Sequence, residues 1–491
     1  MPAEQPHTDQ AHEGRPTARA VWPKILCIWG LPAALVLSST ALFPASAQGS
    51  AKAPLAVHGH AMTADDEQRA DDERGRAEES AKLFVTTPSS EPGQIYGLSQ
   101  LKVYDPKTLK PQLAATVDIG DPKPHHIYPI PGRDIALQAH FGSGSITVDG
   151  AKVPAQVHSL DVVNLVTNEY QGKIDTGPTG LGPRHLGFNP DYTRGYSANF
   201  DGDTISVLDL VNLTLVKTIA VGKKPNYVQR VDPPGPIGPR LFVENFGANT
   251  VTVIDEASLQ VIKTVTVGDG PFNASVAEGG RTLITADSRD NTVTFLDTSS
   301  LMVTDTIAIG GVIDPKVGDI QRLNPRISPE GKWLWVGNQR ASVFSIVNIP
   351  QRRLEKLLPA GKGADIAFFP AGGPAKGLAL LTNRYDTFVT VAKLHGDKAP
   401  TPMKKIRTSA LGSHYITYNS DFSRGYVSER PGRAFSVLDM RTLKEVANVP
   451  VGPGAATDPK NTDPAQAGPD QAFYVWFKNG HAFFHEEQSA C

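Results

Sequence analysis

Histidines are the residues of this chain whose types and spacing could do chemistry, because several recur at matching places in similar strings. The string Pro124-His-His-Ile127 aligns without gaps to Pro183-Arg-His-Leu186, which makes His126 and His185 equivalent. The string Gly412-Ser-His-Tyr-Ile416 aligns His414 with His125. When the alignment of the first two strings is continued, His140 takes the place of Asn199. The candidate metal ligands are therefore His125, His126, His140, His185 and His414.

Such a cluster could serve three kinds of chemistry. Several neutral imidazoles in one cavity are the usual means of holding copper, zinc or iron. They could also supply an axial ligand and hydrogen bonds to a haem-like macrocycle, or a general base and acid for lyase or hydrolase chemistry. The candidate cofactor contacts beside them are Arg184, Tyr415, Glu429 and Arg430. The alternative is that these histidines are hydrogen-bonded residues at strand ends, without a metal or catalytic role.

A repeat must position these residues. Its clearest copies span residues 196–222, 241–268 and 283–310, and each reads as strand, turn, strand, Asp turn, strand and closing Gly. Within a copy the apolar residues alternate with period two and are rich in Val, Ile, Thr, Leu and Phe, which indicates β-strands. A unit of this kind cannot bury its apolar face alone, and all-β units of this length stack radially into a β-propeller.

The closing residues phase the repeat along the chain. They are Gly120, Gly177, Gly222, Gly268, Gly310, Gly361, Ser409 and Gly452, at spacings between 42 and 57 residues. The sequence therefore predicts an all-β fold, a β-propeller of eight four-stranded antiparallel blades over residues 83–452, with seven blades as the alternative.

Two polar columns run through the repeats. The third strand ends in an acid that can fix a tight turn through its own backbone, at Asp105, Asp161, Asp209, Asp255, Asp297 and Asp439. The second strand ends in His140, Asn199, Asn245, Asp287, Asn338, Asn383 and Glu429. Neighbouring strands are antiparallel, so the start of strand one lies beside the end of strand two. We therefore expect the histidines to gather on one face, around the central channel.

The strings that end strand two, such as Val243-Glu-Asn245 and Leu381-Thr-Asn383, resemble those of the YVTN-type propeller repeat family. The resemblance covers residues 83–452. That family shares a superfamily with cytochrome d1-type and nitrous-oxide-reductase-type propellers. The resemblance implies the fold and usually an exported protein, and it implies no single reaction.

The chain ends carry their own signals. An apolar run from Ile25 to Phe43 follows a basic start and precedes Ala45-Ser-Ala47, which predicts a signal peptide over residues 1–47, cleaved after Ala47. An uncleaved membrane anchor is the alternative. Residues 48–82 read as a charged linker, and residues 453–491 as a Pro/Ala-rich linker with a C-terminal hairpin. The first repeat lacks an inner strand, so we expect the aromatic segment Phe473–Phe477 to supply it and close the ring.

Charge and composition narrow the function. Lys and Arg number 48 against 50 Asp and Glu, without a basic stripe, so a nucleic acid partner is not expected. The sequence predicts a periplasmic or secreted monomer, free of the membrane after cleavage, that binds a small-molecule ligand or a protein partner on its channel face. The alternative is an enzyme that depends on a transition metal or a haem-like macrocycle.

Overall fold

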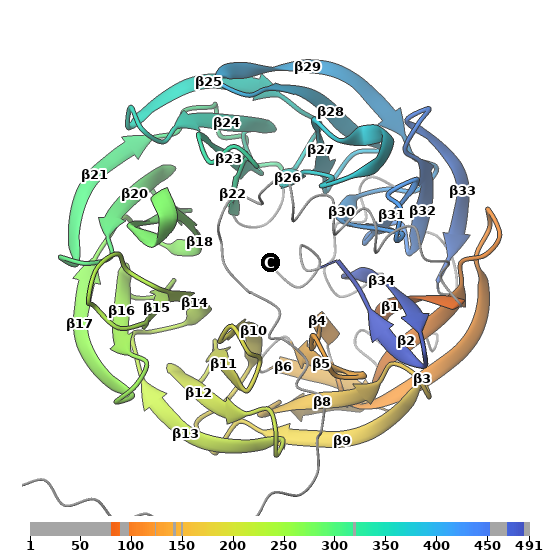
Figure 1. Ribbon diagram of the computed structural model, residues 1–491, viewed down its shortest axis with the longest axis horizontal. Helices are drawn as coiled ribbons and strands as arrows, with labels where there is room; N and C mark the ends of the chain where they lie inside the picture. The colour runs from red at the N-terminus through yellow and green to blue at the C-terminus, as the bar shows by residue number, and fades with distance from the viewer. Residues whose placement is uncertain are drawn as a thin grey trace, which may run out of the picture. The chain divides into compact units, whose positions relative to one another are not determined.

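Eight antiparallel sheets stand around a central axis in the computed structural model (Figure 1). It describes residues 80–88, 98–122, 124–140, 144–148, 151–317, 321–451 and 469–485. The eight-bladed propeller predicted from the repeat is confirmed, and the alternative count of seven is wrong. The predicted signal peptide, the linker up to residue 79 and the closing residue Gly452 lie outside the described residues.

Each blade contains four strands, ordered from the channel outward. The first blade consists of β34 (Ala472–Lys478), β1 (Ser80–Pro88), β2 (Leu98–Asp105) and β3 (Gln112–Pro122), with β35 (His481–Phe483) added beside β34. The second consists of β4 (Pro124–Pro129), β5 (Ile135–His140), β8 (Ser159–Asn164) and β9 (Glu169–Asp175), and the hairpin of β6 (Gly144–Val148) and β7 (Ala151–Ala155) is inserted in it. The third consists of β10 (Pro183–Phe188), β11 (Arg194–Asn199), β12 (Thr204–Asp209) and β13 (Thr214–Ala220).

The remaining blades repeat this order. The fourth consists of β14 (Pro225–Val231), β15 (Arg240–Asn245), β16 (Thr250–Asp255) and β17 (Gln260–Thr266), and the fifth of β18 (Pro271–Ala277), β19 (Thr282–Asp287), β20 (Thr292–Asp297) and β21 (Met302–Ala308). The sixth consists of β22 (Leu323–Ile327), β23 (Trp333–Asn338), β24 (Val343–Asn348) and β25 (Arg353–Pro359), and the seventh of β26 (Ala364–Phe368), β27 (Leu378–Asn383), β28 (Phe388–His395) and β29 (Lys398–Arg407). The eighth consists of β30 (Ser413–Tyr418), β31 (Arg424–Glu429), β32 (Ala434–Asp439) and β33 (Lys444–Pro450).

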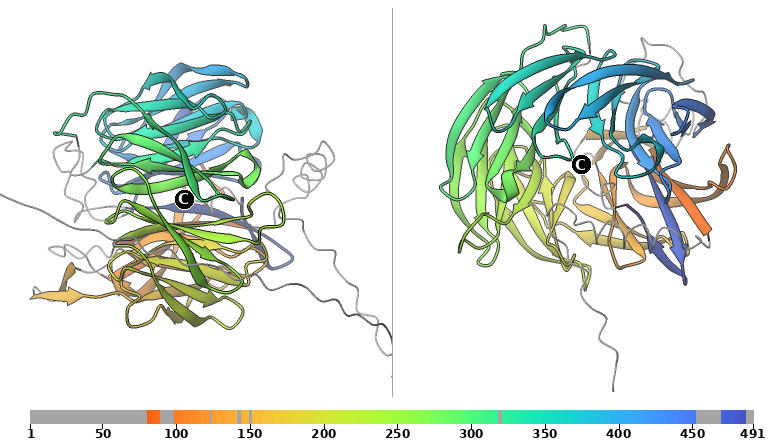
Figure 2. Two further views of the ribbon diagram at one scale, coloured as in Figure 1. Left: turned by 90° about the vertical axis from the view of Figure 1, so that its left-hand side faces the viewer. Right: turned by 45° about the horizontal axis from the view of Figure 1, so that its top comes forward.

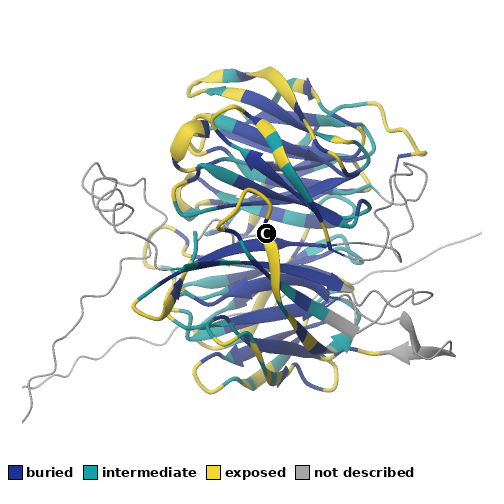
Figure 3. Ribbon diagram, turned by 90° about the vertical axis from the view of Figure 1, so that its right-hand side faces the viewer, coloured by how far each residue is buried: buried dark blue, intermediate teal, exposed yellow. Residues whose placement is uncertain are grey.

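The hydrophobic core lies between adjacent blades. In one cluster Phe84 and Val475 of the first blade pack with Ile127 and Ala136 of the second. The two middle strands of a blade, such as β11 and β12, are buried on both faces, whereas most residues of the fourth strand β13 are exposed or partly buried. Figure 2 shows the blades stacked face to face, and Figure 3 shows buried residues along the strands with exposed ones at the turns.

The C-terminal segment closes the ring, as the aromatic string predicts. Strand β34 pairs antiparallel with β1, with Phe473 opposite Phe84 and Phe477 opposite Ser80. The rings of Phe84 and Phe473 stack with centroids 4.9 Å apart. Because β1 begins at Ser80, the last three residues of the predicted linker belong to this strand.

The acids that end the third strands hold turns, as predicted. Asp209 accepts hydrogen bonds from the backbone N–H groups of Val211 and Asn212 at 2.8 and 2.9 Å. Asp105, Asp255, Asp297 and Asp439 accept equivalent backbone bonds.

Asp161 is the exception, and its predicted place was wrong. It lies inside β8 opposite Gln138, whereas Asn164 ends the strand and accepts the turn bonds from Val166 and Thr167. The β6–β7 hairpin between strands two and three displaced the alignment. Its signal in the sequence is Asp149-Gly150, a pair typical of hairpin turns.

The described residues contain two short 3-10 helices, η1 (Glu278–Gly280) and η2 (Gly373–Ala375). None of the helices in this part of the chain is long and apolar enough to cross a membrane.

Candidate functional site

The inner strands of the blades surround the central channel (Figure 1). Pro124 pairs with His140, Pro183 with Asn199 and Ser413 with Glu429, so strand-one starts do meet strand-two ends. The pairing register shifts directly after this first pair, for example between Pro183 and His185.

This irregularity explains why neighbouring residues can share the channel face. The same shift occurs at the start of β4, β10, β14, β18, β26 and β30. A β-bulge sets two residues opposite one, which breaks the strict alternation of side chains between the two faces of a strand. His125 and His126 are consecutive, and both line the cavity described next.

A cavity lies at this end of the channel, with about 50 Å³ open to the centres of water-sized molecules. Its lining residues come from six blades and are rich in arginine and histidine. They are His125, His126, Arg184, His185, Phe272, Asn273, Arg322, Asn324, Pro325, Arg326, Ile366, Arg384, His414 and Arg430. Each of the four histidines is no more than 5% exposed.

A belt of polar side chains surrounds this cavity, with one member from each blade. Its members, in order around the ring, are Asn226, Asn273, Asn324, Asp365, His414, Asp470, His125 and His185. We call this set the polar belt. Successive members from Asn226 to His185 contact each other, at distances that include 3.1 Å for Asn226–Asn273, 2.8 Å for Asn273–Asn324 and 2.7 Å for Asn324–Asp365. The belt therefore ties the inner ends of the blades together.

The histidine half of the belt contains a pair of imidazoles that face each other. His125 Nε2 lies 3.4 Å from His185 Nε2. The opposite nitrogen of each ring is held from behind, since His125 Nδ1 lies 2.5 Å from Asp470 Oδ2 and His185 Nδ1 lies 3.2 Å from the Tyr128 hydroxyl.

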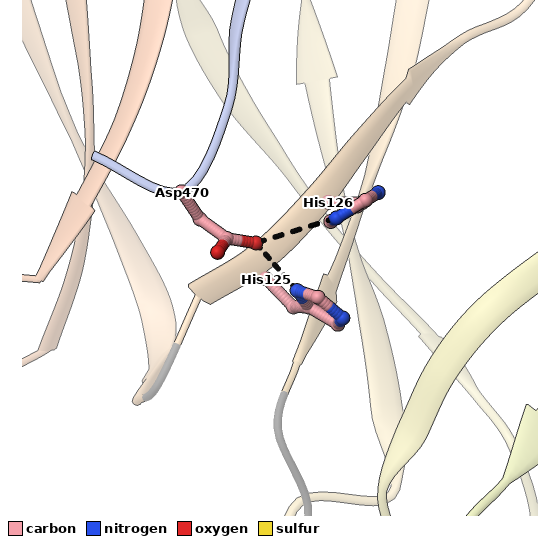
Figure 4. A group of neighbouring side chains, drawn as sticks. All are labelled: His125, His126 and Asp470. Carbon is pink, nitrogen blue, oxygen red and sulfur yellow. Dashed lines mark hydrogen bonds and ion pairs between the residues drawn. The ribbon is translucent and has the colours of Figure 1, made fainter. Parts of the chain in front are cut away.

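Asp470 joins this pair to two further histidines, His126 and His414. Figure 4 shows Asp470 with His125 and His126. Its Oδ2 lies 3.5 Å from His126 Nε2, and its Oδ1 lies 3.5 Å from His414 Nε2 and 2.9 Å from Arg430 Nη1. The ring centroids of His126 lie 4.2 Å from His125 and 5.1 Å from His185. Three imidazoles and one carboxylate thus meet within one buried group.

His414 connects this group to a second carboxylate. His414 Nδ1 lies 2.6 Å from Asp365 Oδ2, and Arg384 Nη2 lies 3.2 Å from the same oxygen. Burial alone would raise the pKa of Asp365, but the charges of Arg384 and His414 lower it to about 2. Burial would likewise raise the pKa of Asp470, and Arg430 and His125 hold it well below its usual range. Both carboxylates are therefore ionised at neutral pH.

The imidazoles of the pair are neutral at the same pH. Burial lowers the pKa of His125 to about 3, although Asp470 acts in the opposite direction. Burial and the neighbouring His125 hold the pKa values of His126 and His185 well below the usual range. Burial, followed by the charge of Arg322, lowers the pKa of Arg184 to about 9. The cavity thus combines neutral imidazoles with crowded guanidinium groups.

The structure brings together most of the predicted site residues. His125, His126, His185 and His414 line the cavity with Arg184 and Arg430. Tyr415 is buried behind His126, with ring centroids 5.9 Å apart, and is not among the lining residues.

His140 and Glu429 do not join the cavity lining. Both belong to the column that ends strand two, and their side chains turn into the blade. His140 Nε2 lies 2.8 Å from Asp161 Oδ2, and Glu429 accepts a hydrogen bond from Asn448 Nδ2 at 2.8 Å. The expectation that His140 shares a pocket with the other histidines was wrong. The bulge in this blade that bears on the cavity lies at the start of β4, and the pairing of β5 with β8 is regular, so His140 stays paired inside the blade.

Sequence reasoning missed several residues of the site. They are Asp470, Asp365, Arg322, Arg326 and Arg384. Two of them carried a signal: Arg384 follows Asn383 as Arg430 follows Glu429, and Asp365 occupies the register place of His414. Asp470 had no such signal, since it ends a Pro- and Ala-rich segment that reads as a linker.

The comparisons with known proteins bear on the fold. No protein-family model matches the chain, and the curated protein sequences give no match. Dihydro-heme d1 dehydrogenase NirN in complex with DHE is similar in structure, with a TM-score of 0.54 and 15% identity over 78% of this chain and 76% of NirN. A putative 6-phosphogluconolactonase from Bacteroides fragilis gives a TM-score of 0.44 and 14% identity over 67% and 95%. Kuenenia stuttgartiensis hydrazine synthase gives 0.41 and 18% over 60% and 92%. At such identities the likeness to NirN supports the propeller architecture alone.

Proposed function

We propose that this protein binds a small carboxylate-bearing ligand in the cavity at the end of its propeller channel. The observation that carries the proposal is the charge of the lining. Five arginines line the cavity, and its fourteen lining residues include no Asp or Glu. The two buried carboxylates that pair with this lining, Asp365 and Asp470, leave a formal excess of three positive charges.

The geometry favours an organic anion over a neutral ligand. Arginine presents a planar fork of donors that matches a carboxylate. Crowded guanidinium groups repel each other, which is why the charge of Arg322 adds to burial in lowering the pKa of Arg184. An anion bound between them would relieve that repulsion.

Calorimetry with a carboxylate probe tests the proposal. Citrate should bind metal-free, chelator-treated protein, and its uncharged triethyl ester should not. Arg184→Gln should weaken citrate binding roughly tenfold or more, the usual value of a charged hydrogen bond. Arg289→Gln, on an exposed arginine paired with Asp269 outside the cavity, is the matched control. Equal affinities for citrate and its ester, or unchanged binding by Arg184→Gln, would overturn the proposal.

A haem-like macrocycle is the second candidate ligand. Its carboxylates would meet the arginines, and an imidazole of the cluster would supply an axial ligand. NirN, which has a similar fold, was solved in complex with DHE. Haemin added to the protein should then give a shifted Soret band that is lost in His126→Ala. An unshifted spectrum would leave the simpler carboxylate ligand.

We also infer that the protein is exported, on the basis of the sequence pattern over residues 1–47. We infer as well, from the strings that end strand two, that the chain is a member of the YVTN-type repeat family. N-terminal sequencing of the mature protein should begin at Gln48. A chain that begins at Met1 in the membrane fraction would favour the uncleaved anchor.

A further inference from the structure

The facing imidazoles of His125 and His185 are spaced as two ligands of one metal ion. Bonds from zinc to histidine nitrogen measure about 2.0–2.1 Å, and at a tetrahedral angle two such nitrogens lie about 3.3–3.4 Å apart. His125 Nε2 and His185 Nε2 are 3.4 Å apart. This distance is longer than the usual range of about 2.7–3.2 Å for a hydrogen bond from a nitrogen donor.

The groups behind the two rings are those that metal-binding histidines require. A ligating histidine usually donates its other ring N–H to a carboxylate or another oxygen, which fixes the tautomer and the ring orientation. Asp470 holds His125 Nδ1 and the Tyr128 hydroxyl lies against His185 Nδ1. Both Nε2 lone pairs are then directed at the space between the rings.

His126 lies beside the pair and is the third imidazole of this group. Its ring centroid is 4.2 Å from that of His125 and 5.1 Å from that of His185. One of its nitrogens lies within 4.8 Å of a nitrogen of His125 and of an oxygen of Asp470, a group that does not include His185. Asp470 and Asp365 partly offset the positive charge of the nearby arginines, which would otherwise disfavour a cation.

We propose that His125, His185 and His126 form a binding site for a divalent transition metal ion of the zinc and copper class. Imidazole ligands suit these ions, and three protein ligands would leave a fourth position that faces the cavity. Tyr128 and Asp470 are positioning residues, which act on the metal through the rings that they hold.

Metal uptake by the purified full chain tests this site. After chelator treatment, equilibrium dialysis against Zn²⁺ should give one tightly held ion per chain, and Co²⁺ in its place should give the visible absorption of tetrahedral coordination. His185→Ala should abolish both. His158→Ala, on an exposed side chain at 53%, is the matched control and should bind as the unchanged protein does.

Two further variants keep the test decisive. Tyr128→Phe removes only the hydroxyl beside His185, and it should keep the stoichiometry while raising the Kd for Zn²⁺ about 10–100-fold. The double variant H58A/H60A removes a second histidine pair, which lies outside the described residues, and should leave uptake unchanged. Uptake that persists in a folded His185→Ala, an unchanged Kd in Tyr128→Phe, or uptake lost with His58 and His60 would overturn the proposal. The citrate experiment is done without metal, so the two proposals fail independently.

Discussion

At the scale of single residues, the column that ends strand two separates structural polar groups from functional ones. Asn199 donates to Ser206 Oγ at 2.8 Å, and Asn245 donates to Thr252 Oγ1 at the same distance. Asp287 accepts from Thr294 Oγ1 at 2.6 Å. Each of these partners lies on the third strand, two residues after the residue paired with the end of strand two. Asp161, the partner of His140, occupies the corresponding position in the second blade. The column therefore serves the blades, and the bulged first strands serve the cavity.

Glu429 is a column residue whose protonation should set a pH dependence of stability. Burial raises its pKa to about 7 from the usual 4.5. The folded state then binds more protons than the unfolded state between these values, so the free energy of unfolding should fall as pH rises from about 4.5 to 7. Glu429→Gln keeps the shape without the charge, and it should stabilise the protein at pH 8 by up to roughly 3 kcal/mol.

Chemical denaturation at pH 4.5 and pH 8 measures this effect. The difference between Glu429→Gln and the unchanged protein should be larger at pH 8. Glu330→Gln, on an exposed glutamate, should differ little at either pH. An equal difference at both pH values would show that the Glu429 carboxyl does not titrate in this window.

At the scale of elements, the C-terminal strand β34 takes the place of the inner strand that the other blades obtain from their own repeats. Its residues Ala472 to Val475 are buried, and Phe473 is completely buried against Phe84. The edge of the first blade would otherwise expose its backbone groups. A strand from the far end of the chain thus replaces the missing inner strand.

Truncation of Phe473 should be costly for that reason. Phe473→Ala should lower the free energy of unfolding by about 3–5 kcal/mol, the usual value for a large buried aromatic residue. Phe483→Ala, on a ring that is 43% exposed in β35, should change it by no more than about 1 kcal/mol. Denaturant melts of both variants would measure this, and equal midpoints would show that β34 is not part of the core.

At the scale of the whole molecule, ring closure and the cavity depend on the same segment. Asp470 lies two residues before β34 and contacts His125, His126, His414 and Arg430. When β34 pairs with β1, the Asp470 carboxylate is therefore placed against the histidines of the cavity.

Removal of the segment that carries Asp470 and β34 should lower the stability of the protein. A chain that ends at residue 468 should melt at a markedly lower temperature, because the first blade loses its inner strand and the ring opens. A chain that ends at His485 keeps β34 and β35 and is the control. If the shorter chain melts like the control, the segment does not close the ring.

The repeat made the architecture readable from the sequence alone. Period-two strands, turn acids such as Asp209 and closing glycines are local signals, and a unit with one apolar face has few ways to bury it. The same register made His125, Arg184 and His414 equivalent, and the structure sets all three at the cavity. Local pattern therefore determined the number of blades and which strand ends face the channel.

The composition of the site was decided by the tertiary structure. The bulge at the start of β4 contains His126, which lines the cavity, whereas His140 at the end of β5 turns to Asp161. Asp365 and Asp470 become partners of the histidines only when distant blades meet around the channel. A polar residue at a strand end has the same local pattern whether it holds a blade or lines a cavity, because that difference depends on which neighbours the closed ring brings to it.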